Sequence, residues 1–565
     1  MKSLLSELRP LLRYLAVFSF FMNLLLLAPA IFMLQVFDRV LTSNSKETLV
    51  VLLGGTAIAL LILFILDYVR NRLQNVLGTI IDERLSPPVV NFIVAYTARA
   101  PHGAKSSGMR DVTTMRNLFS ANGLIALFDA PWVVIYVAVI WAFHPALGMG
   151  AAVAAVVMLT MAWLNNLLSR SALDSLQKEG QRASQYVDSS LRNAEVLQTL
   201  GMTDNLLKRW RALQNRLAAE QTSASRTTVV FAALTRFMRQ AIQILMMALG
   251  AYLVLSGEAS GGVMIATTVL LGRAVQPVEQ LVANWRMLTD ARAAYRRLQE
   301  LSKGFDEERA PQLALPCPDG HVTVDGVAYR AAGSDRVILN GIALSLAAGE
   351  ALAVIGPSAA GKSTLARLLT GVWRPSAGNV RLDGADVAYW PREDLGQWIG
   401  YVPQDVELFD GSVGDNIARL GAVDAEAVVL AAQRANAHEL ILSLPQGYDT
   451  QVGEQGARLS PGQRQRIALA RALFGNPRLV VLDEPNSNLD GAGEAALAQA
   501  LSGLRSEGVT TVVVTHRPSL IAHVDKILVL EAGRVAQFGP AAEVMKAMQR
   551  KNQAMVDDDK IAASA

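Results

Sequence analysis

The stretch GPSAAGKS, residues 356–363, matches the pattern G-x-x-x-x-G-K-[ST]. In this pattern the glycines let the backbone turn so that its N–H groups point at phosphate oxygens. Lys362 supplies a charge toward the β- and γ-phosphates, and the Ser363 hydroxyl can ligate Mg²⁺. An apolar run typical of a buried strand, 351–355, precedes the stretch, and a helical segment, 364–370, follows it. This order of strand, loop and helix predicts an α/β domain that binds nucleotide phosphates.

The phosphates should be held by backbone N–H groups of this loop and by the dipole of the helix that starts in it. The residues that we expect around them are Gly356, Pro357, Ser358, Ala359, Ala360, Gly361, Lys362, Ser363 and Thr364. A nucleotide and its Mg²⁺ are therefore the predicted ligands of this segment.

Two further apolar runs end in residues that suit the same chemistry. The run 479–482 leads into Asp483 and Glu484, as a buried parallel strand would if it delivered carboxylates at its C-terminal end. We predict that Asp483 holds Mg²⁺ and that Glu484 polarises the attacking water. The run 511–514 leads to His516, which would then contact the γ-phosphate. The alternatives are a surface acid pair and a purely structural histidine, and the phosphate loop favours the catalytic interpretation.

A second anion-binding device is predicted in LSPGQRQR, residues 459–466. Ser460 is a good N-cap and Gln463 follows three residues later, which is the capping-box pattern. Pro461 falls at the first helical position, where its missing N–H is tolerated because that N–H would be unpaired anyway. We expect the helix to continue to Phe474, with a free N-terminus that can bind an anion.

The composition divides the chain into a membrane half and a soluble half. Of its 565 residues, 52% are hydrophobic and only 18% are charged, and the long apolar runs lie before about residue 290. A net charge of +3 is too small to indicate a nucleic-acid partner, and we predict none. Cys317 is the only cysteine, so an internal disulfide is excluded.

Six segments are long and apolar enough to span a membrane, each with about 20 mostly apolar residues. They lie near 15–37, 48–68, 123–143, 146–167, 229–255 and 260–282. Arg236 and Arg239 interrupt the fifth segment, and Arg273 interrupts the sixth. We favour side chains that face a polar pathway inside a bundle, and the alternative is snorkelling or a helix end. A cleavable signal peptide is disfavoured because the first apolar run continues past its candidate cleavage site, 28–30.

The connections between the spans predict the orientation. The segments 69–122 and 168–228 are long, basic and helical in pattern, whereas the loops near 144–145 and 256–260 carry no lysine or arginine. The positive-inside rule assigns the two basic segments and the N-terminus to the cytoplasm. Because they are too long for turns, we expect the spanning helices to extend beyond the bilayer.

The stretch FDAPW, residues 128–132, puts an acid and a proline near the start of the third span. It is either a kinked helix end or an element of the substrate path, and the sequence leaves both open. We expect a transmembrane domain at 1–303, a linker at 304–320, an ATPase domain at 321–550 and a disordered tail at 551–565.

Taken together, these motifs resemble the ATP-binding cassette family. Besides the phosphate loop they comprise Gln404 in YVPQDVELF, LSPGQ at 459–463, VVLDEP at 480–485, SNLD at 487–490 and His516. A chain with one six-span domain and one cassette is similar in its arrangement to the half-transporter exporters. The resemblance implies a multi-domain chain, in which an all-α six-helix transmembrane domain precedes an α/β P-loop cassette.

The resemblance also implies a homodimer, because each ATP of such exporters lies between the phosphate loop of one chain and the signature of the other. Ser460, Gly462 and Gln463 would contact the nucleotide, and Asp490 would contact across the dimer. Gln404 would join Ser363 and Asp483 around Mg²⁺ and couple the nucleotide site to the membrane domain, and His516 would sense the γ-phosphate.

Within the family, the chain resembles the permease/ATPase of type I secretion systems, in the subgroup that exports proteases and lipases. The grounds are FMLQVFDRVLTSNSKETL at 32–49, FDAPW and the short N-terminus. Related toxin exporters carry an extra N-terminal peptidase-like domain, which we expect to be absent because about a dozen residues precede the first span. The implied partners are membrane lipid, a secreted polypeptide, a periplasmic adaptor and an outer-membrane channel, around a protein of the inner membrane.

Two positions depart from the family pattern. Pro461 stands where the signature has glycine, which removes one backbone N–H while the Ser460 hydroxyl and the Gly462 N–H remain. The family stacks adenine on an aromatic residue near the first cassette strand, where this chain has Ala331, with Tyr329 two residues earlier. Tyr329 is therefore the candidate for adenine stacking.

The sequence favours an ATP-driven exporter of unfolded polypeptides. The second candidate is an exporter of lipids or small hydrophobic molecules with the same architecture. A third, of a different class, is a membrane sensor or scaffold that binds ATP without transport, and an intact Glu484 and His516 argue against it.

Overall fold

The computed structural model describes residues 2–99, 107–120, 122–191, 193–308, 315–331 and 336–550. They form two compact units: Met1–Ile93 with Lys105–Gly304, and Val94–Ala104 with Phe305–Ala565. The predicted domain boundaries stay a prediction, and part of the linker and the whole tail 551–565 lie outside the described residues.

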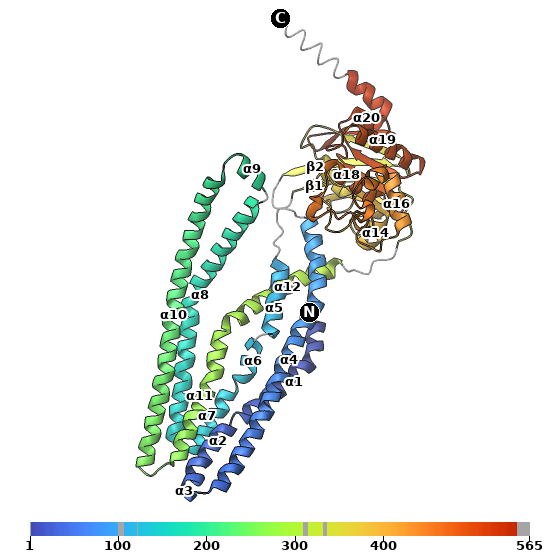
Figure 1. The fold of residues 1–565 in the computed structure, drawn as a ribbon. Helices are drawn as coiled ribbons and strands as arrows, with labels where there is room; N and C mark the ends of the chain where they lie inside the picture. Colours follow the sequence, from blue (N-terminus) through green and yellow to red (C-terminus); the bar gives the residue numbers. More distant parts are fainter. Residues whose placement is uncertain are drawn as a thin grey trace. The chain divides into compact units, whose positions relative to one another are not determined.

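The first unit is helical in all of its described elements (Figure 1). The described helices up to residue 308 are α1 (Lys2–Leu25), α2 (Ala28–Gln35), the π-helical turn η1 (Val36–Val40), α3 (Leu41–Ser43), α4 (Lys46–Arg99), α5 (Ser107–Ser120), α6 (Asn122–Asp129), α7 (Trp132–Phe143), α8 (Pro145–Leu191), α9 (Ala194–Thr199), α10 (Thr203–Leu255), α11 (Gly261–Ala283) and α12 (Trp285–Glu308). Six stretches of these helices are long and apolar enough to cross a membrane, which confirms the six predicted spans.

Three helices are far longer than a bilayer requires. α4, α8 and α10 contain 54, 47 and 53 residues, whereas a span needs about 20. At about 1.5 Å per residue, α4 is roughly 80 Å long. The helical extensions that the long basic segments predicted are therefore present, and α8 and α10 run side by side along much of their length (Figure 1).

The membrane unit is apolar on its outside because lipid rather than water surrounds it. No residue is buried in the apolar window of α4, where Val51 and Phe64 are exposed. The described buried apolar residues of this unit form two clusters, and the larger packs α2, α7, α8, α10 and α11 around Tyr136 and Ile140, both fully buried. The outer side chains and the core thus have the same polarity, as expected for a bundle in a bilayer.

FDAPW forms a break between two helices. α6 ends at Asp129 and α7 begins at Trp132, with Pro131 at the N-cap. Pro131 has no N–H to donate, so a helix can start after it without losing a backbone hydrogen bond. The break turns the carboxylate of Asp129 toward α1 and α4, where it meets Asn23 and Arg70.

The second unit contains two sheets. The strands are β1 (Val322–Arg330), β2 (Val337–Leu346), β3 (Ala351–Ile355), β4 (Ala377–Leu382), β5 (Ala385–Asp386), β6 (Ile399–Val402), β7 (Leu479–Asp483), β8 (Thr510–Val514), β9 (Lys526–Glu531) and β10 (Arg534–Pro540). An antiparallel sheet has the order β2-β1-β4-β5, and the larger sheet has the order β10-β9-β3-β8-β7-β6. Strands β3, β6, β7, β8 and β9 pair in parallel, and only β10 is antiparallel to its neighbour.

Helices and short helical turns cover the larger sheet, and three apolar clusters of described residues pack on it. They are α13 (Lys362–Leu369), α14 (Arg392–Trp398), α15 (Val413–Ile417), α16 (Ala425–Arg434), α17 (His438–Leu442), η2 (Gly447–Asp449), η3 (Glu454–Gly456), α18 (Pro461–Leu473), α19 (Gly491–Ser506) and α20 (Pro518–Ile521). Every residue of β3, β7 and β8 is buried, as expected of parallel strands covered on both faces. This confirms an α/β cassette after a helical membrane region.

Candidate functional site

The candidate site lies at the carboxyl edge of the larger sheet. Because β3, β8, β7 and β6 are parallel neighbours, the segments that follow them meet at one edge. These segments are the phosphate loop after β3, His516 after β8, Glu484 after β7 and Gln404 after β6. The topology thus brings together residues that are up to 160 positions apart in the chain.

The phosphate loop has the tight backbone that its glycines predicted. Gly356 has φ of 152°, and a Cβ on it would lie 2.2 Å from the carbonyl oxygen of Leu530. Gly361 has φ of 97°, in the left-handed region, and it precedes α13 as the N-cap. Lys362 is buried, and its Nζ donates to the carbonyl oxygens of Gly356 and Pro357 at 2.8 and 3.0 Å. The ammonium group therefore lies inside the loop.

Asp483 is a buried carboxylate whose only described polar neighbour close to hydrogen-bonding range is the Ser363 hydroxyl. It is 1% exposed at the end of β7, and within the described part of the chain neither carboxylate oxygen makes a hydrogen bond of ordinary geometry. Burial raises the pKa of Asp483; the nearby Ser363 hydroxyl opposes the shift, Glu484 adds to it, and Arg367 and Lys362 oppose it more weakly. A buried carboxylate beside a hydroxyl is a donor set that suits Mg²⁺.

Glu484 is held in an uncommon backbone conformation. Its φ is 50°, which is rare outside glycine, and its N–H donates to the carbonyl of Val514 at 3.0 Å. The side chain accepts a hydrogen bond from Gln404 at 3.1 Å, and Gln465 donates to its carbonyl oxygen at 3.3 Å. Contacts from the segment after β6, from β8 and from α18 thus fix the position of one carboxylate, as expected where strain serves a function.

His516 is exposed, one residue beyond the buried Thr515. The Thr515 hydroxyl donates to Asn486 at 3.3 Å and accepts from the N–H of Arg517 at 3.1 Å, so the backbone on both sides of the histidine is anchored. The imidazole is therefore presented to solvent at the same edge as Glu484.

The signature segment starts a helix as its sequence predicted. The Ser460 N–H donates to Oε1 of Gln463 at 2.8 Å, and the Gln463 N–H donates to the Ser460 hydroxyl at 3.2 Å. This confirms the capping box, and Pro461 occupies the first helical position. The predicted helix end was one residue too late, because α18 ends at Leu473 and Phe474 is already extended.

The signature opens onto a surface of its own. A cavity of about 520 Å³ is lined by Ser460, Gly462, Gln463 and Asp490, and none of its described lining residues comes from 356–363. Asp490 also caps α19 by accepting from the N–H of Gly493 at 2.8 Å. This cavity therefore contains the signature and no described residue of the phosphate loop.

Tyr329 already has an aromatic partner. Its ring stacks on Trp373 with a centroid distance of 5.0 Å, and its side chain is 8% exposed. The Arg367 guanidinium lies over the other ring, 4.7 Å from the Trp373 centroid. Adenine stacking on Tyr329 stays a prediction, and it would require this buried ring to become accessible.

Several residues of the site were not singled out from the sequence. Gln465 is 3% exposed and bridges the backbone of Glu484 and Asn488, which ties α18 to the segment after β7. Its only sequence signal is its place on the inward face of the predicted helix. Arg367, one turn into α13, acts on the pKa of Asp483, and no local pattern distinguishes it from a surface arginine.

Family models match both halves of the chain. The model described as "ABC transporter transmembrane region" matches residues 12–278, and the model described as "ABC transporter" matches residues 339–487. A bacterial Atm1-family ABC exporter with ATP bound has the same fold, with a TM-score of 0.81 over 97% of this chain and 98% of that chain at 24% identity.

Curated relatives match along almost the whole length. The type I secretion system ATP-binding protein PrsD of Rhizobium meliloti is 40% identical over 95% of this chain and 92% of its own. The toxin RTX-I translocation ATP-binding protein of Actinobacillus pleuropneumoniae is 30% identical over 94% of this chain and 75% of its own. The alpha-hemolysin translocation ATP-binding protein HlyB of Escherichia coli O6:H1 is 29% identical over the same two shares.

Proposed function

Because this chain belongs to the ATP-binding cassette transporters, among the ATP-binding proteins of type I secretion systems, we propose that it exports an unfolded polypeptide from the cytoplasm across the inner membrane. It is an ATPase with a membrane-spanning region, and ATP hydrolysis drives the export. The observation that carries the proposal is the full-length similarity to PrsD, together with relatives named for toxin translocation.

We propose that the nucleotide binds at the carboxyl edge of the larger sheet. The loop residues 356–361, apart from Pro357, which has no N–H, and the first turn of α13, including Thr364, offer backbone N–H groups to the phosphates. Lys362 exchanges its two carbonyl partners for the β- and γ-phosphate oxygens, which carry more charge. The buried position of Lys362 supports this role because the side chain needs little reorganisation.

Ser363, Asp483 and Gln404 are the proposed Mg²⁺ ligands, directly or through water. The unpartnered carboxylate of Asp483 supports this assignment, since a buried ionised group needs a counter-charge. When bound, Mg²⁺ neutralises charge on the phosphate oxygens. Gln404 donates to Glu484, the residue next to Asp483, which suits it to relay nucleotide binding to the membrane domain.

Glu484 is the proposed general base. Its carboxylate orients a water for attack on the γ-phosphate and accepts a proton from it, while the anchored backbone keeps the group in line. His516 contacts the γ-phosphate from the neighbouring strand. Both roles need only small side-chain motions because Glu484 and His516 already lie at one edge.

We propose that the chain works as a homodimer with composite sites. The signature helix begins with a capped, solvent-facing N-terminus that has no phosphate loop beside it in its own cavity. An anion bound there would be the γ-phosphate on a second copy, contacted by the Ser460 hydroxyl and the N–H groups of Gly462 and Gln463, with Asp490 alongside. Pro461 removes one N–H but starts the helix in the required geometry.

The proposed orientation puts the cassette and the basic helical extensions in the cytoplasm of a cell with an inner membrane. A periplasmic adaptor and an outer-membrane channel would then complete the export path. Export of lipids or small hydrophobic molecules is the second candidate, because the same engine can drive it. A sensor without transport is disfavoured because the complete set of hydrolytic residues meets at one edge.

The Glu484→Gln variant tests the proposal. We expect steady ATP hydrolysis to fall by a factor on the order of 10² or more while ATP binding is kept, because the amide cannot accept the proton. In cells that carry only this variant, the proposed substrate should disappear from the medium and accumulate inside, as measured by mass spectrometry of both fractions. Glu507→Gln is the matched control, since Glu507 pairs with Arg434 away from the site.

Two outcomes would contradict separate parts of the proposal. Hydrolysis near the wild-type rate in Glu484→Gln would show that another group is the base. Lost hydrolysis with an unchanged set of proteins in the medium, and an altered lipid composition of the outer membrane, would favour the lipid exporter.

A further inference from the structure

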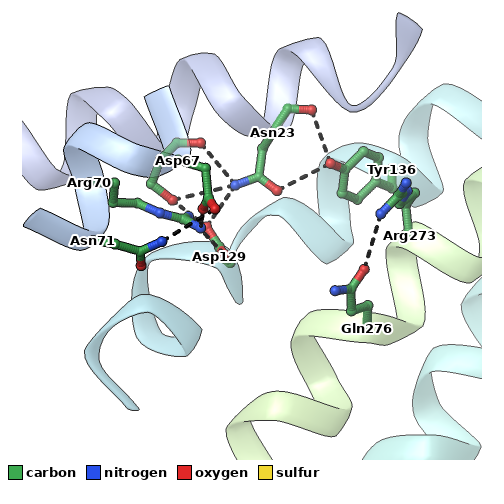
Figure 2. A network of polar contacts seen from close by, with 9 residues as sticks. Asn23, Asp67, Arg70, Asn71, Asp129, Tyr136, Arg273 and Gln276 are labelled. Atoms are coloured by element: carbon green, nitrogen blue, oxygen red, sulfur yellow. Dashed lines mark hydrogen bonds and ion pairs between the residues drawn. The ribbon is translucent and has the colours of Figure 1, made fainter. Parts of the chain in front are cut away.

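A polar cavity lies inside the membrane unit. Its volume is about 290 Å³, and its wall is formed by α1, α4, α6, α7 and α11. Figure 2 shows that charged and amide side chains from these helices point toward one another. Asp67 lies at the end of the second predicted span and Arg70 just beyond it, whereas Arg273 lies near the middle of the sixth. The cavity therefore reaches from one bilayer surface toward its middle, where ionised groups are rare and functional.

One side of the cavity is a closed ion-pair cluster. Arg70, 9% exposed, is 2.9 Å from Asp67 and 3.6 Å from Asp129. Asp129 also accepts from Asn23 at 2.7 Å and from the Ser19 hydroxyl. With three donors on its two oxygens, Asp129 is satisfied within the bundle. This side carries two carboxylates and one guanidinium, a formal charge of −1.

The other side carries a cation without a counter-charge. Arg273 lines the cavity from α11, and its Nη1 donates to Gln276, one turn along the same helix, at 3.4 Å (Figure 2). Among the residues that the structure describes, no carboxylate lies within ion-pair distance of it. By contrast Arg239, on the neighbouring α10, pairs with Glu279 at 3.4 Å. A guanidinium at this depth needs an anion. The excess negative charge of the Arg70 cluster balances Arg273 only across the cavity, and no described carboxylate pairs with it directly.

The rest of the wall matches a polypeptide better than a lipid. Amide side chains of Asn23, Asn71, Gln276 and Gln280 surround the space. Asn23 is engaged by Asp129 and Tyr136, whereas Asn71 keeps its carbonyl oxygen and Gln276 its NH₂ group beside the bonds that they make to Asp67 and Arg273. An extended chain leaving water needs such groups for its backbone N–H and C=O. Acyl chains would gain little here, because few apolar side chains line the space. The volume equals that of about ten waters, enough for an acidic side chain with some solvent.

We propose that Arg273 is the cation of a carboxylate-binding subsite in the membrane bundle, which takes acidic groups of the exported polypeptide. This inference rests on the proposed export of polypeptides. The Arg70 cluster holds the wall in place, and Arg273 supplies the charge-assisted hydrogen bonds. Acidic residues would thus gain a contact on the path that their amide counterparts lack.

The test compares two synthetic peptides on the full-length protein in nanodiscs of a zwitterionic lipid. Both are short, flexible and fluorescently labelled, and one has aspartate where the other has asparagine. By fluorescence anisotropy the wild type should bind the aspartate peptide about tenfold more tightly, the worth of one charge-assisted hydrogen bond. Arg273→Gln should abolish the preference, and Arg273→Lys should keep part of it, because it retains the charge but not the planar fork.

Arg236→Gln is the matched control. It removes the same charge from a membrane helix, but Arg236 is exposed, donates to the Ala232 carbonyl on its own helix and lies outside the cavity. This variant should keep the wild-type preference. A preference that survives in Arg273→Gln, or that disappears equally in Arg236→Gln, would overturn the assignment of Arg273.

The outcomes separate this inference from the function beneath it. If wild type binds the two peptides equally, the subsite is wrong and polypeptide export stands. If neither peptide binds, polypeptide export itself is contradicted, and the subsite with it. A third outcome concerns nanodiscs that contain an anionic phospholipid. If this lipid abolishes binding of the aspartate peptide to wild type but leaves binding to Arg273→Gln unchanged, a lipid phosphate occupies the subsite. The carboxylate proposal then fails.

Discussion

Asp483 is the residue whose proposed role most plainly opposes stability. Its carboxylate is buried without a hydrogen-bond partner in the described part of the chain, and burial raises its pKa. Ionising Asp483 therefore costs more free energy in the folded protein than in the unfolded chain, which lowers the free energy of unfolding. Above the raised pKa the wild type carries this penalty, and below the ordinary pKa of about 3.9 both states are protonated and the penalty vanishes.

We predict that Asp483→Asn stabilises the nucleotide-free cassette at neutral pH. The amide removes the buried charge, and a gain of about 1 kcal/mol would raise the melting temperature of a domain of this size by about 2–4 °C. The gain should shrink as the pH falls through the raised pKa of Asp483. Differential scanning fluorimetry in a chelating buffer, over a pH series, measures this difference.

Asp415 provides a control of opposite sign. Hydrogen bonds from the Ser412 N–H and hydroxyl lower the pKa of Asp415, so its charged form stabilises the fold. Asp415→Asn should lower the melting temperature at neutral pH, and the loss should fade as the pH falls through the lowered pKa. An Asp483→Asn protein that melts below wild type at neutral pH would mean that the carboxylate has a partner in solution.

At the scale of elements, local sequence patterns predicted the structural features that depend on contacts between residues close together in the chain. The capping box of α18 follows from Ser460 and Gln463, and the buried strands β3 and β7 follow from their apolar runs. The backbone geometry of the phosphate loop requires glycine at particular positions, so a sequence motif can identify them. These features need no knowledge of the rest of the chain.

Contacts between distant elements were not predictable in the same way. Tyr329 stacks on Trp373 across the second unit, and the hydroxyl of Tyr136 lies 3.0 Å from the carbonyl oxygen of Asn23 across the bundle. No single-sequence pattern encodes such partners, because each depends on how two elements pack. The sequence identified Arg273 as an intramembrane charge, and only the fold reveals the cavity that it lines.

The cap of α18 carries an element-scale prediction. Ser460→Ala removes the side-chain half of the capping box and should cost about 1 kcal/mol of stability. It should also lower ATP hydrolysis, since the same hydroxyl is proposed to meet the γ-phosphate. Chemical denaturation measures the first effect, and a steady-state ATPase assay of the full-length protein measures the second.

Ser412→Ala separates these two effects. Ser412 forms the same capping box at α15, with Asp415 as its partner, and it is not proposed to contact nucleotide. Both variants should lose similar stability, but only Ser460→Ala should lose hydrolysis. Equal losses of hydrolysis in the two would reduce Ser460 to a structural cap.

At the scale of the whole molecule, the phosphate loop and the signature are the two halves of the nucleotide site that we propose, and they lie in separate places. The phosphate loop follows β3, while Ser460 and Asp490 line a separate cavity without any described loop residue. Each half has a complete local structure, so neither looks like a remnant. A second copy would supply the missing half to each site, which gives the dimer two equivalent sites related by its two-fold axis.

This arrangement predicts complementation between two inactive chains. Lys362→Ala disables the phosphate loop, and Ser460→Arg blocks the signature with a bulky cation. Dimers of either variant alone should be inactive, because both of their sites are damaged. In a mixed dimer one site combines the two defects, and the other joins an intact loop from one chain to an intact signature from its partner.

Co-expression with two different affinity tags and purification over both would isolate the mixed dimer for an ATPase assay. In this first mixture, hydrolysis should reappear at up to about half the wild-type rate if the two sites act independently. In a second mixture, the double variant Lys362→Ala/Ser460→Arg is paired with wild type. That dimer has no intact composite site and should be inactive. If the loop and the signature acted within one chain, the first mixture would be inactive and the second would retain half. The two mixtures therefore give opposite results for the two arrangements, which makes the ratio of their rates a direct measure of whether ATP is held between chains.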